Sequence, residues 1–204
     1  MNRSANQKMN IRKEEIYRVA TRLFREKGYN ATGMRDIALE VGVEAASLYN
    51  HIRSKSELLQ QCCFRMTGDF SRQLEEQEQR DSSLALEKIE AILRFHIRAW
   101  INRLDEVLVA THEGKYLEEP WLTEFMQERR RYMKRIEHII RQGMDHGHIR
   151  RAETYPIMLT IMSTVRGIEF WHRKQQEVSA PDLEDGLVDV IIRGLLPIPS
   201  FHRS

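Results

Sequence analysis

The chain has 204 residues, of which 41% are hydrophobic and 30% are charged. This composition is typical of a globular protein and excludes a chain that is disordered throughout. No apolar run is long enough to cross a bilayer, and the first ten residues, MNRSANQKMN, lack the apolar core of a signal peptide. Cys62 and Cys63 are adjacent and form no disulfide framework, so we expect a reduced, cytoplasmic protein without membrane attachment.

The net charge of +2 is unevenly distributed along the chain. Residues 1–60 carry 11 Lys and Arg against 7 Asp and Glu, whereas residues 61–204 carry 21 against 23. The N-terminal part is therefore the one suited to attract phosphate. A surplus of this size indicates a nucleic-acid partner only together with a motif.

The first nine residues are polar, and we expect a mobile arm there. Its Arg3 and Lys8 would either be disordered or touch the DNA backbone or minor groove. A first helix is predicted over residues 11–27, ending at Gly28, because apolar residues recur there at helical spacing. The stripe consists of Ile16, Val19, Ala20, Leu23 and Phe24.

Residues 32–55, TGMRDIALEVGVEAASLYNHIRSK, predict two short helices joined by a tight turn. Gly42 can adopt the left-handed conformation that ends a helix without a Cβ clash. The apolar residues that would face inward are Ile37, Ala38, Val41, Val43, Leu48 and Ile52. The polar residues left pointing outward are Ser47, Tyr49, Asn50 and His51. This pattern indicates a helix-turn-helix, whose second helix enters a DNA major groove.

Three segments carry a family resemblance: LFREKGYNAT, MRDIALEVGV and SLYNHIRSKSELL, in this order near the N-terminus. Together they resemble the DNA-binding module of TetR-family transcriptional repressors, over residues 11–59. The resemblance implies a helix-turn-helix DNA-binding domain over residues 1–58. A helical domain for ligand binding and dimerisation would follow over residues 59–204.

Thr32 is expected to cap the second helix and to donate to a phosphate at the same time. The family often has another hydroxyl at the next position, where this chain has Gly33. Arg35 would reach a phosphate or groove, or remain solvated. The full set of expected DNA contacts is Thr32, Arg35, Glu44, Ala45, Ala46, Ser47, Tyr49, Asn50, His51 and Lys55.

The recognition helix departs from the family pattern at Glu44, where a small hydroxyl residue is usual. Its carboxylate would repel phosphate but could accept from a cytosine amino group. Ala46 could touch a thymine methyl, and Ser47 a base edge or a phosphate. The resemblance assigns Tyr49 to the sugar-phosphate backbone and Lys55 to a phosphate. The alternative is a helix that only packs and has no DNA role.

The rest of the chain also follows the helical period. A long helix is predicted from Lys55 to the polar run EEQEQRD. Cys62 and Cys63 would be small core residues of this helix or, alternatively, would have a redox role. Five further helices are predicted over residues 82–102, 104–113, 120–146, 154–177 and 181–195. Nothing alternates with period two over the length of a strand. The fold class is therefore all-α, with about nine helices.

Three polar residues, His96, Arg129 and Arg166, fall within apolar stripes. In one interpretation, His96 is a core histidine whose ring nitrogens are hydrogen-bonded, and the two arginines reach solvent. In the other, all three are polar anchors in a cavity for an amphiphilic, anionic effector. The predicted ligand-binding set is Met66, His96, Trp100, Phe125, Arg129, Met162 and Arg166. The segment GIEFWHRKQQEVSAPDLEDGLVDVIIRGLL is similar to that of acyl-CoA-responsive repressors, which implies a CoA thioester or a long-chain molecule as the effector.

The last two helices are expected to form a homodimer, which the family builds as a four-helix bundle. Small residues allow close helix approach, and the last helix has two apolar faces, one for its own core and one for a partner. The predicted interface consists of Ser163, Gly167, Trp171, Leu187, Ile191 and Leu195. A two-fold dimer would place its recognition helices about 34–36 Å apart on a palindromic operator.

These expectations describe a ligand-responsive repressor without a cofactor. No GxSxG, Walker A, HExxH or dinucleotide-binding motif indicates an enzyme. The run DHGH at residues 145–148 would suggest a metal, but Gly147 also fits a helix C-cap. The remaining alternative is an all-α protein that binds a ligand or partner but no DNA.

Overall fold

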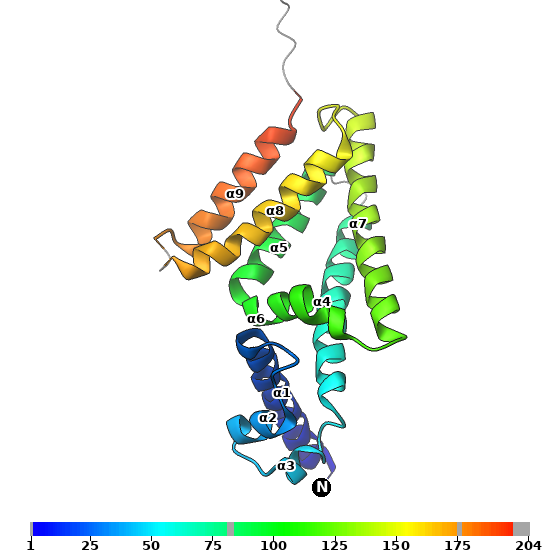
Figure 1. The fold of residues 1–204 in the computed structure, drawn as a ribbon. Coiled ribbons are helices and arrows are strands. Elements are labelled where there is room, and N and C mark those ends of the chain that lie inside the picture. Colours follow the sequence, from blue (N-terminus) through cyan, green and yellow to red (C-terminus); the bar gives the residue numbers. More distant parts are fainter. Residues whose placement is uncertain (1, 81–83, 175–176, 198–204) are drawn as a thin grey trace, which may run out of the picture. The chain divides into compact units, whose positions relative to one another are not determined.

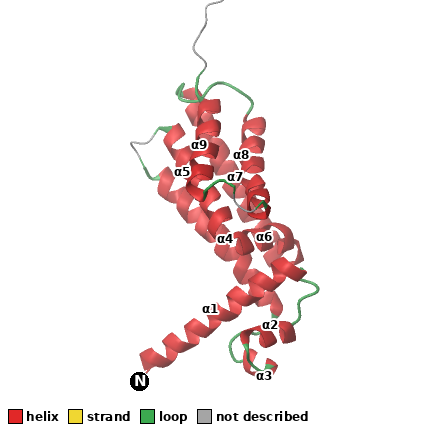
Figure 2. Cartoon of the chain, turned by 90° about the vertical axis from the view of Figure 1, so that its left-hand side faces the viewer, coloured by secondary structure: helices red, strands yellow, loops and turns green. Residues whose placement is uncertain are grey.

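The computed structural model describes residues 2–80, 84–174 and 177–197, with side chains from Arg12 onward. Over these residues the chain forms helices and loops and no strand (Figures 1 and 2). This confirms the predicted all-α fold. None of the helices among the described residues is both long enough and apolar enough to cross a membrane.

Nine α-helices lie in the described part of the chain, with a π-helical turn and a 3₁₀ turn between the sixth and the seventh. The helices are α1 (Asn2–Lys27), α2 (Met34–Val41), α3 (Ala45–Leu48), α4 (Lys55–Glu78), α5 (Ala85–Asn102), α6 (Leu104–Leu108), α7 (Trp121–Asp145), α8 (Thr154–Arg173) and α9 (Ala180–Leu195). The π-helical turn is η1 (Val109–Glu113), and the 3₁₀ turn is η2 (Gly114–Tyr116).

The contacts divide the chain into two compact units. The first unit contains the described residues up to Asp69 together with Asp105–Glu128. The second unit contains Phe70–Leu104 and the described residues from Arg129 on. Because compactness alone defines these units, the functional boundary between residues 58 and 59 remains a prediction.

In the first unit, α2 packs against α1, and α3 packs against α2 (Figure 1). The predicted apolar stripe of α1 is buried, and it packs with the inward residues of α2 and α3. The fully buried members of this core include Ile16, Ala20, Phe24, Ile37 and Leu48. Cys62 and Cys63 of α4 are also buried, as expected of small core residues.

The second unit packs α5 against both α8 and α9. Glu184 of α9 is buried, and its carboxylate accepts from Arg98 of α5 at 2.9 and 3.0 Å and from Arg94 at 3.0 Å. These charge-assisted bonds hold the pKa of Glu184 below its usual value despite burial. The apolar core of this unit includes Ile89, Leu93, Ile97, Ile140, Ile161 and Ile168.

Three predicted elements differ from the structure. α1 begins at Asn2, so the expected mobile arm over residues 1–9 is wrong for the described residues, which continue the helix. The single helix expected over residues 104–113 is α6 followed by the π-helical turn η1. α8 ends at Arg173, four residues before the predicted end, and residues 175–176 lie outside the described part. The predicted start of the fifth helix also lies outside it, at residues 81–83.

Candidate nucleic-acid interface

A helix-turn-helix forms where it was predicted. Ile37, Ala38 and Val41 bury one face of α2. Gly42 ends the helix in the left-handed conformation, with φ 73°, and the Val43 N–H then bonds to the Ala38 carbonyl at 2.9 Å. The chain thereby reverses within a few residues and starts α3 at Ala45.

Thr32 does not have the role that was expected of it. Gly33 is the N-cap of α2, and its N–H is satisfied by the Asp36 carboxylate at 2.7 Å. Thr32 is 1% exposed, and its hydroxyl donates to the carbonyl oxygens of Gly28 at 2.9 Å and Leu23 at 3.3 Å. A hydroxyl used in this way ties the loop to the end of α1 and is not available to a phosphate.

The outward face of α3 carries small and aromatic residues. Ala46, Ser47 and Tyr49 are exposed, Tyr49 by 55%, while Leu48 is fully buried beneath them. Glu44 precedes the helix as its N-cap, and its side chain makes no capping hydrogen bond. The four-residue α3 therefore presents the face predicted for groove contact.

Asn50 and His51 lie in the turns after α3 and not on a longer recognition helix. Their N–H groups bond to the carbonyls of Ser47 at 3.2 Å and Leu48 at 3.0 Å. Asn50 is exposed, as expected, but His51 is half-buried, and its Nδ1 is buried without a hydrogen-bond partner in the described structure. The prediction that His51 faces outward is therefore wrong for this ring nitrogen.

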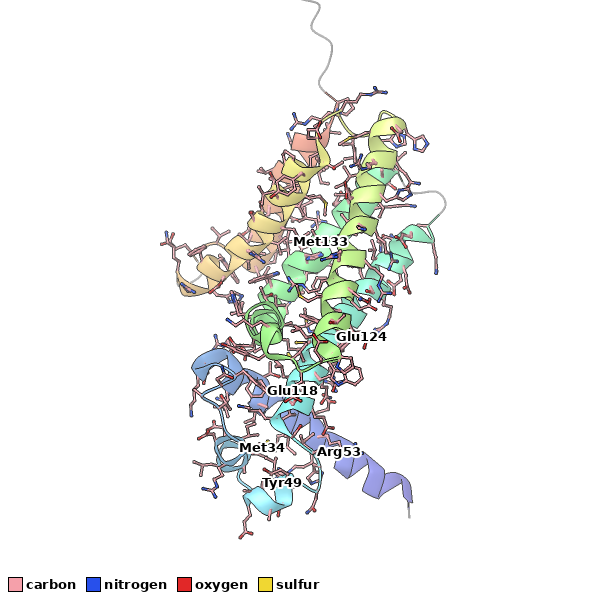
Figure 3. All side chains as sticks on the ribbon, turned by 45° about the vertical axis from the view of Figure 1, so that its right-hand side comes forward. Met34, Tyr49, Arg53, Glu118, Glu124 and Met133 are labelled. Carbon is pink, nitrogen blue, oxygen red and sulfur yellow. The ribbon has the colours of Figure 1, made fainter. Side chains whose placement is uncertain are left out.

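Lys55, the first residue of α4, lies against Tyr29. Its ammonium donates to the Tyr29 carbonyl at 2.8 Å and lies 4.2 Å from the centre of the Tyr29 ring. An ammonium has three donors, so this bond leaves donors for a phosphate oxygen. The exposed Arg53, two residues earlier, is a further cation that the sequence prediction omitted (Figure 3). Its position in the loop between α3 and α4, close in sequence to the expected contact Lys55, could have indicated it.

His96, predicted as a ligand anchor or a core histidine, is buried in an aromatic cluster of the second unit. Its Nε2 is 2.7 Å from the Tyr132 hydroxyl, and its ring packs edge-on against Phe70, with centroids 4.5 Å apart. Burial lowers the pKa of His96 to about 3 and raises that of Tyr132. Both groups are therefore neutral at neutral pH. These contacts agree with the interpretation of His96 as a hydrogen-bonded core histidine.

The other predicted ligand residues fall in both units. Met66 and Phe125 are buried in the first unit, and Trp100 is buried in the second. Arg129 and Met162 are half-buried, whereas Arg166 is exposed on α8. A cavity shared by the whole set remains a prediction.

An open cavity that the sequence did not indicate lies between α5 and the start of α9. Its volume is about 380 Å³, and Arg94, Arg98 and Pro181 line it. The arginines there are paired with Glu184 and Asp185, with N–O distances of 2.7–3.0 Å. The cavity therefore has compensated charge and does not present a free cationic site.

Two predicted dimer residues need correction. Ile191 and Leu195 are buried in the core of their own chain and do not offer a surface to a partner. Leu187 and Trp171 are half-buried, and the Trp171 indole donates to the Val178 carbonyl at 2.8 Å. The exposed apolar residues of these two helices are Tyr155, Leu159, Phe170 and Val190.

The described residues contain no group of three or more His, Cys, Asp or Glu arranged to hold a metal ion. In the DHGH run, Gly147 has φ 73°, and the His148 N–H bonds to the Gly143 carbonyl at 2.8 Å. This geometry is a helix C-cap, the structural alternative to a metal site in this run.

Comparisons with known proteins agree with this architecture. Residues 16–62 match the family "Bacterial regulatory proteins, tetR family", and residues 82–195 match "Tetracyclin repressor-like, C-terminal domain". The chain is 22% identical over 189 residues to the HTH-type transcriptional repressor KstR2 of Mycolicibacterium smegmatis, and the match covers 90% of each protein.

Solved structures show the same fold. The ketosteroid transcriptional regulator KstR2 of Mycobacterium tuberculosis has a TM-score of 0.83 at 20% identity, covering 92% of this chain and 96% of that one. AibR, in complex with isovaleryl coenzyme A and operator DNA, has a TM-score of 0.77 at 24% identity, covering 91% and 100%. The matched family and KstR2 are transcriptional regulators and not enzymes. The two family matches together cover most of the chain, which therefore belongs to the TetR family of bacterial transcriptional regulators.

Proposed function

We propose that this protein is a transcriptional repressor that binds a palindromic operator as a homodimer and is released by a small amphiphilic effector. The observation that carries the proposal is the outward face of α3, where Ala46, Ser47 and Tyr49 are exposed on a helix-turn-helix whose opposite face is buried. Small side chains let a helix approach base edges closely, and a tyrosine hydroxyl can bond a phosphate.

Cations around this face support DNA binding. Arg35 and Arg53 are exposed, and Lys55 lies at the start of α4. Each would neutralise a phosphate and so contribute to affinity in a salt-dependent way. We assign DNA binding to residues 1–58 and effector binding and dimerisation to residues 59–204, and we place the protein in the cytoplasm, where it meets the chromosome.

We propose that the dimer forms through the exposed faces of α8 and α9. Tyr155, Leu159 and Phe170 of α8 and Val190 of α9 expose large apolar surfaces in the single chain. Large apolar side chains that are exposed to solvent along two helices indicate an interaction surface. Ser163 and Gly167 on α8 would allow the helices of two protomers to approach closely, since a Cβ added at Gly167 meets no atom within 4 Å.

We propose a CoA thioester as the effector. Support comes from the similar fold of AibR, whose structure contains isovaleryl coenzyme A. The effector would stabilise a state in which the two recognition helices are misplaced for successive major grooves. Because effector and operator would favour different states, each must weaken the binding of the other by the same factor.

The test is binding of the purified protein to duplexes selected from its own genome, measured by fluorescence anisotropy between 50 and 300 mM salt. We expect Kd values on the order of 10⁻⁸ M or tighter for a palindromic site and a steep salt dependence. Arg53→Ala should weaken binding and reduce the salt slope by about one per protomer. The matched control is Arg130→Ala, because Arg130 is also exposed but lies on α7. This change should leave the affinity and the salt slope unchanged.

Effector release is tested on the same complex by adding acyl-CoA thioesters of increasing chain length, with free CoA and the free acids as controls. A chain-length-dependent loss of anisotropy supports the proposal. A protein that binds acyl-CoA but no duplex at 50 mM salt would be a ligand-binding protein without a DNA role, and the repressor proposal would be wrong.

A further inference from the structure

Tyr29, in the loop between α1 and α2, is held at both ends of its backbone. Its N–H donates to Oε2 of Glu113 at 2.8 Å, and its carbonyl accepts from the Lys55 ammonium at 2.8 Å. Glu113 and Lys55 thus bond to the two backbone polar groups of the same residue. Glu113 lies outside the helix-turn-helix, at the end of η1, and belongs to the same compact unit.

We infer that Glu113 is a positioning residue for the DNA contact of Lys55, and that it acts through Tyr29. This inference rests on the proposed DNA-binding function. Lys55 has a long, flexible side chain, which would lose rotamer entropy on meeting a phosphate. The Tyr29 carbonyl and ring fix its ammonium before DNA arrives, and Glu113 fixes Tyr29.

The ring of Tyr29 is fixed together with its backbone. It packs edge-on against Phe24, with centroids 5.2 Å apart, and is stacked with Tyr116 at 5.9 Å. Lys55 lies over this ring, so a cation–π contact and a hydrogen bond place the ammonium on one residue. Movement of Tyr29 would therefore displace both contacts of Lys55 together.

Glu113 is itself held in place by the residue that follows it. Gly114 is buried, and a Cβ added there would lie 2.7 Å from Cε1 of Phe125 and 3.5 Å from Sγ of Cys63. The backbone next to Glu113 thus packs closely against side chains of α7 and α4. The π-helical turn η1 ends at Glu113, and such turns occur frequently at functional sites.

The segment that carries Glu113 has two further polar contacts with α1. Asp105 pairs with Arg25 at 2.8 Å, and the Glu106 carboxylate accepts from the Tyr17 hydroxyl at 3.1 Å. Neither contact involves the Tyr29 loop or Lys55. They allow two roles of Glu113 to be distinguished. If Glu113 only attaches the segment to α1, Asp105 has the same role. If Glu113 positions Lys55, Asp105 has no part in that role.

The experiment measures operator affinity against salt concentration for the full-length protein and for single and double variants. Glu113→Ala removes the acceptor for the Tyr29 N–H and should weaken binding about tenfold, which is 1.4 kcal/mol. It should also reduce the slope of log K against log salt by about 0.9 per protomer, the loss of one phosphate contact. Glu113→Gln keeps an acceptor oxygen and should remain within about threefold of the natural protein.

Glu113→Asp is a second variant that keeps the charge but is one methylene too short to reach the Tyr29 N–H. It should show the same loss of affinity and of salt slope as Glu113→Ala. It can be used in place of Glu113→Ala if the alanine variant does not fold. Lys55→Met should show the same loss of slope, and the Glu113→Ala/Lys55→Met double variant should lose nothing more, because both changes remove one contact. Asp105→Ala should leave the slope unchanged.

Three results would overturn the inference. The first is a full salt slope in both Glu113→Ala and Glu113→Asp. The second is a double variant whose losses add, and the third is an equal effect of Asp105→Ala. If the natural protein binds no duplex, the proposed function is wrong and the inference with it, whereas tight natural binding with a full slope in the Glu113 variants overturns the inference alone.

Discussion

His96 shows how burial changes the chemistry of a single residue. Its pKa is lowered to about 3, whereas a histidine in the unfolded chain takes up a proton near pH 6.5. Acid therefore stabilises the unfolded state but not the folded one. The contribution of neutral His96 to stability is full above about pH 6.5 and is lost as the pH falls from there toward 3.

We predict that this histidine makes the free energy of unfolding depend on pH. Between pH 7 and pH 5 the natural protein should lose about 2 kcal/mol more than His96→Gln, since one extra proton binds the unfolded chain at about 1.4 kcal/mol per pH unit. Glutamine does not titrate and can still bond the Tyr132 hydroxyl. Urea unfolding of both proteins at three pH values measures the difference, and identical pH dependence would contradict the prediction.

The exposure of an individual residue could be predicted from the sequence where the residue lies on a helix with a clear apolar stripe. Ala46, Ser47 and Tyr49 point outward because Leu48 is the apolar residue of that turn. The role of Thr32 could not be predicted, because its hydroxyl bonds to carbonyls at the end of α1 and their proximity depends on how the loop returns. The contact between Tyr29 and Glu113, 84 residues apart, leaves no local pattern either.

At the scale of elements, the helical period predicted most of the long helices well, because an amphipathic stripe marks each one. It missed the change from α6 to η1, since a π-helical turn inserts one residue without changing which residues are apolar. Glycines inside helices were equally ambiguous in the sequence. The structure separates those that tight packing requires from those that it does not.

We predict opposite effects of alanine at two such glycines. Gly68 in α4 has no atom within 4 Å of an added Cβ, so Gly68→Ala should stabilise the protein by about 0.5–1 kcal/mol through helix propensity. At Gly143 in α7 the Cβ would lie 2.6 Å from Cδ1 of Ile149 and 2.7 Å from Cβ of Ala85, and overpacking should cost about 1–3 kcal/mol. Chemical denaturation of the two variants measures the change in the free energy of unfolding for each. Changes of the same sign and size would contradict this account.

At the scale of the whole molecule, the sequence predicted the fold class and the family but not the division into compact units. Residues 105–128 belong to the unit that contains the helix-turn-helix, through contacts such as Tyr17 with Glu106 and Arg25 with Asp105. These residues lie far apart in the chain, and periodicity carries no information about such pairs. Burial of Ile191 and Leu195 likewise required knowing which face of α9 meets α5.

The proposed dimer gives the last prediction. Phe170 on α8 is 67% exposed, and burying it against a second protomer would remove a large apolar surface from water. Phe170→Glu should therefore shift the protein from dimer to monomer in analytical ultracentrifugation at micromolar concentration. Operator affinity should fall at least a hundredfold, because two half-sites would no longer be bound by one linked molecule.

Leu39→Glu is the matched control for this change. Leu39 is 81% exposed on α2, in the other compact unit, so the same gain of charge there should leave the oligomeric state unchanged. If Phe170→Glu remained a dimer, the exposed face of α8 would not be the interface. If the natural protein sedimented as a monomer, recognition of a palindrome would require two chains to meet only on the DNA.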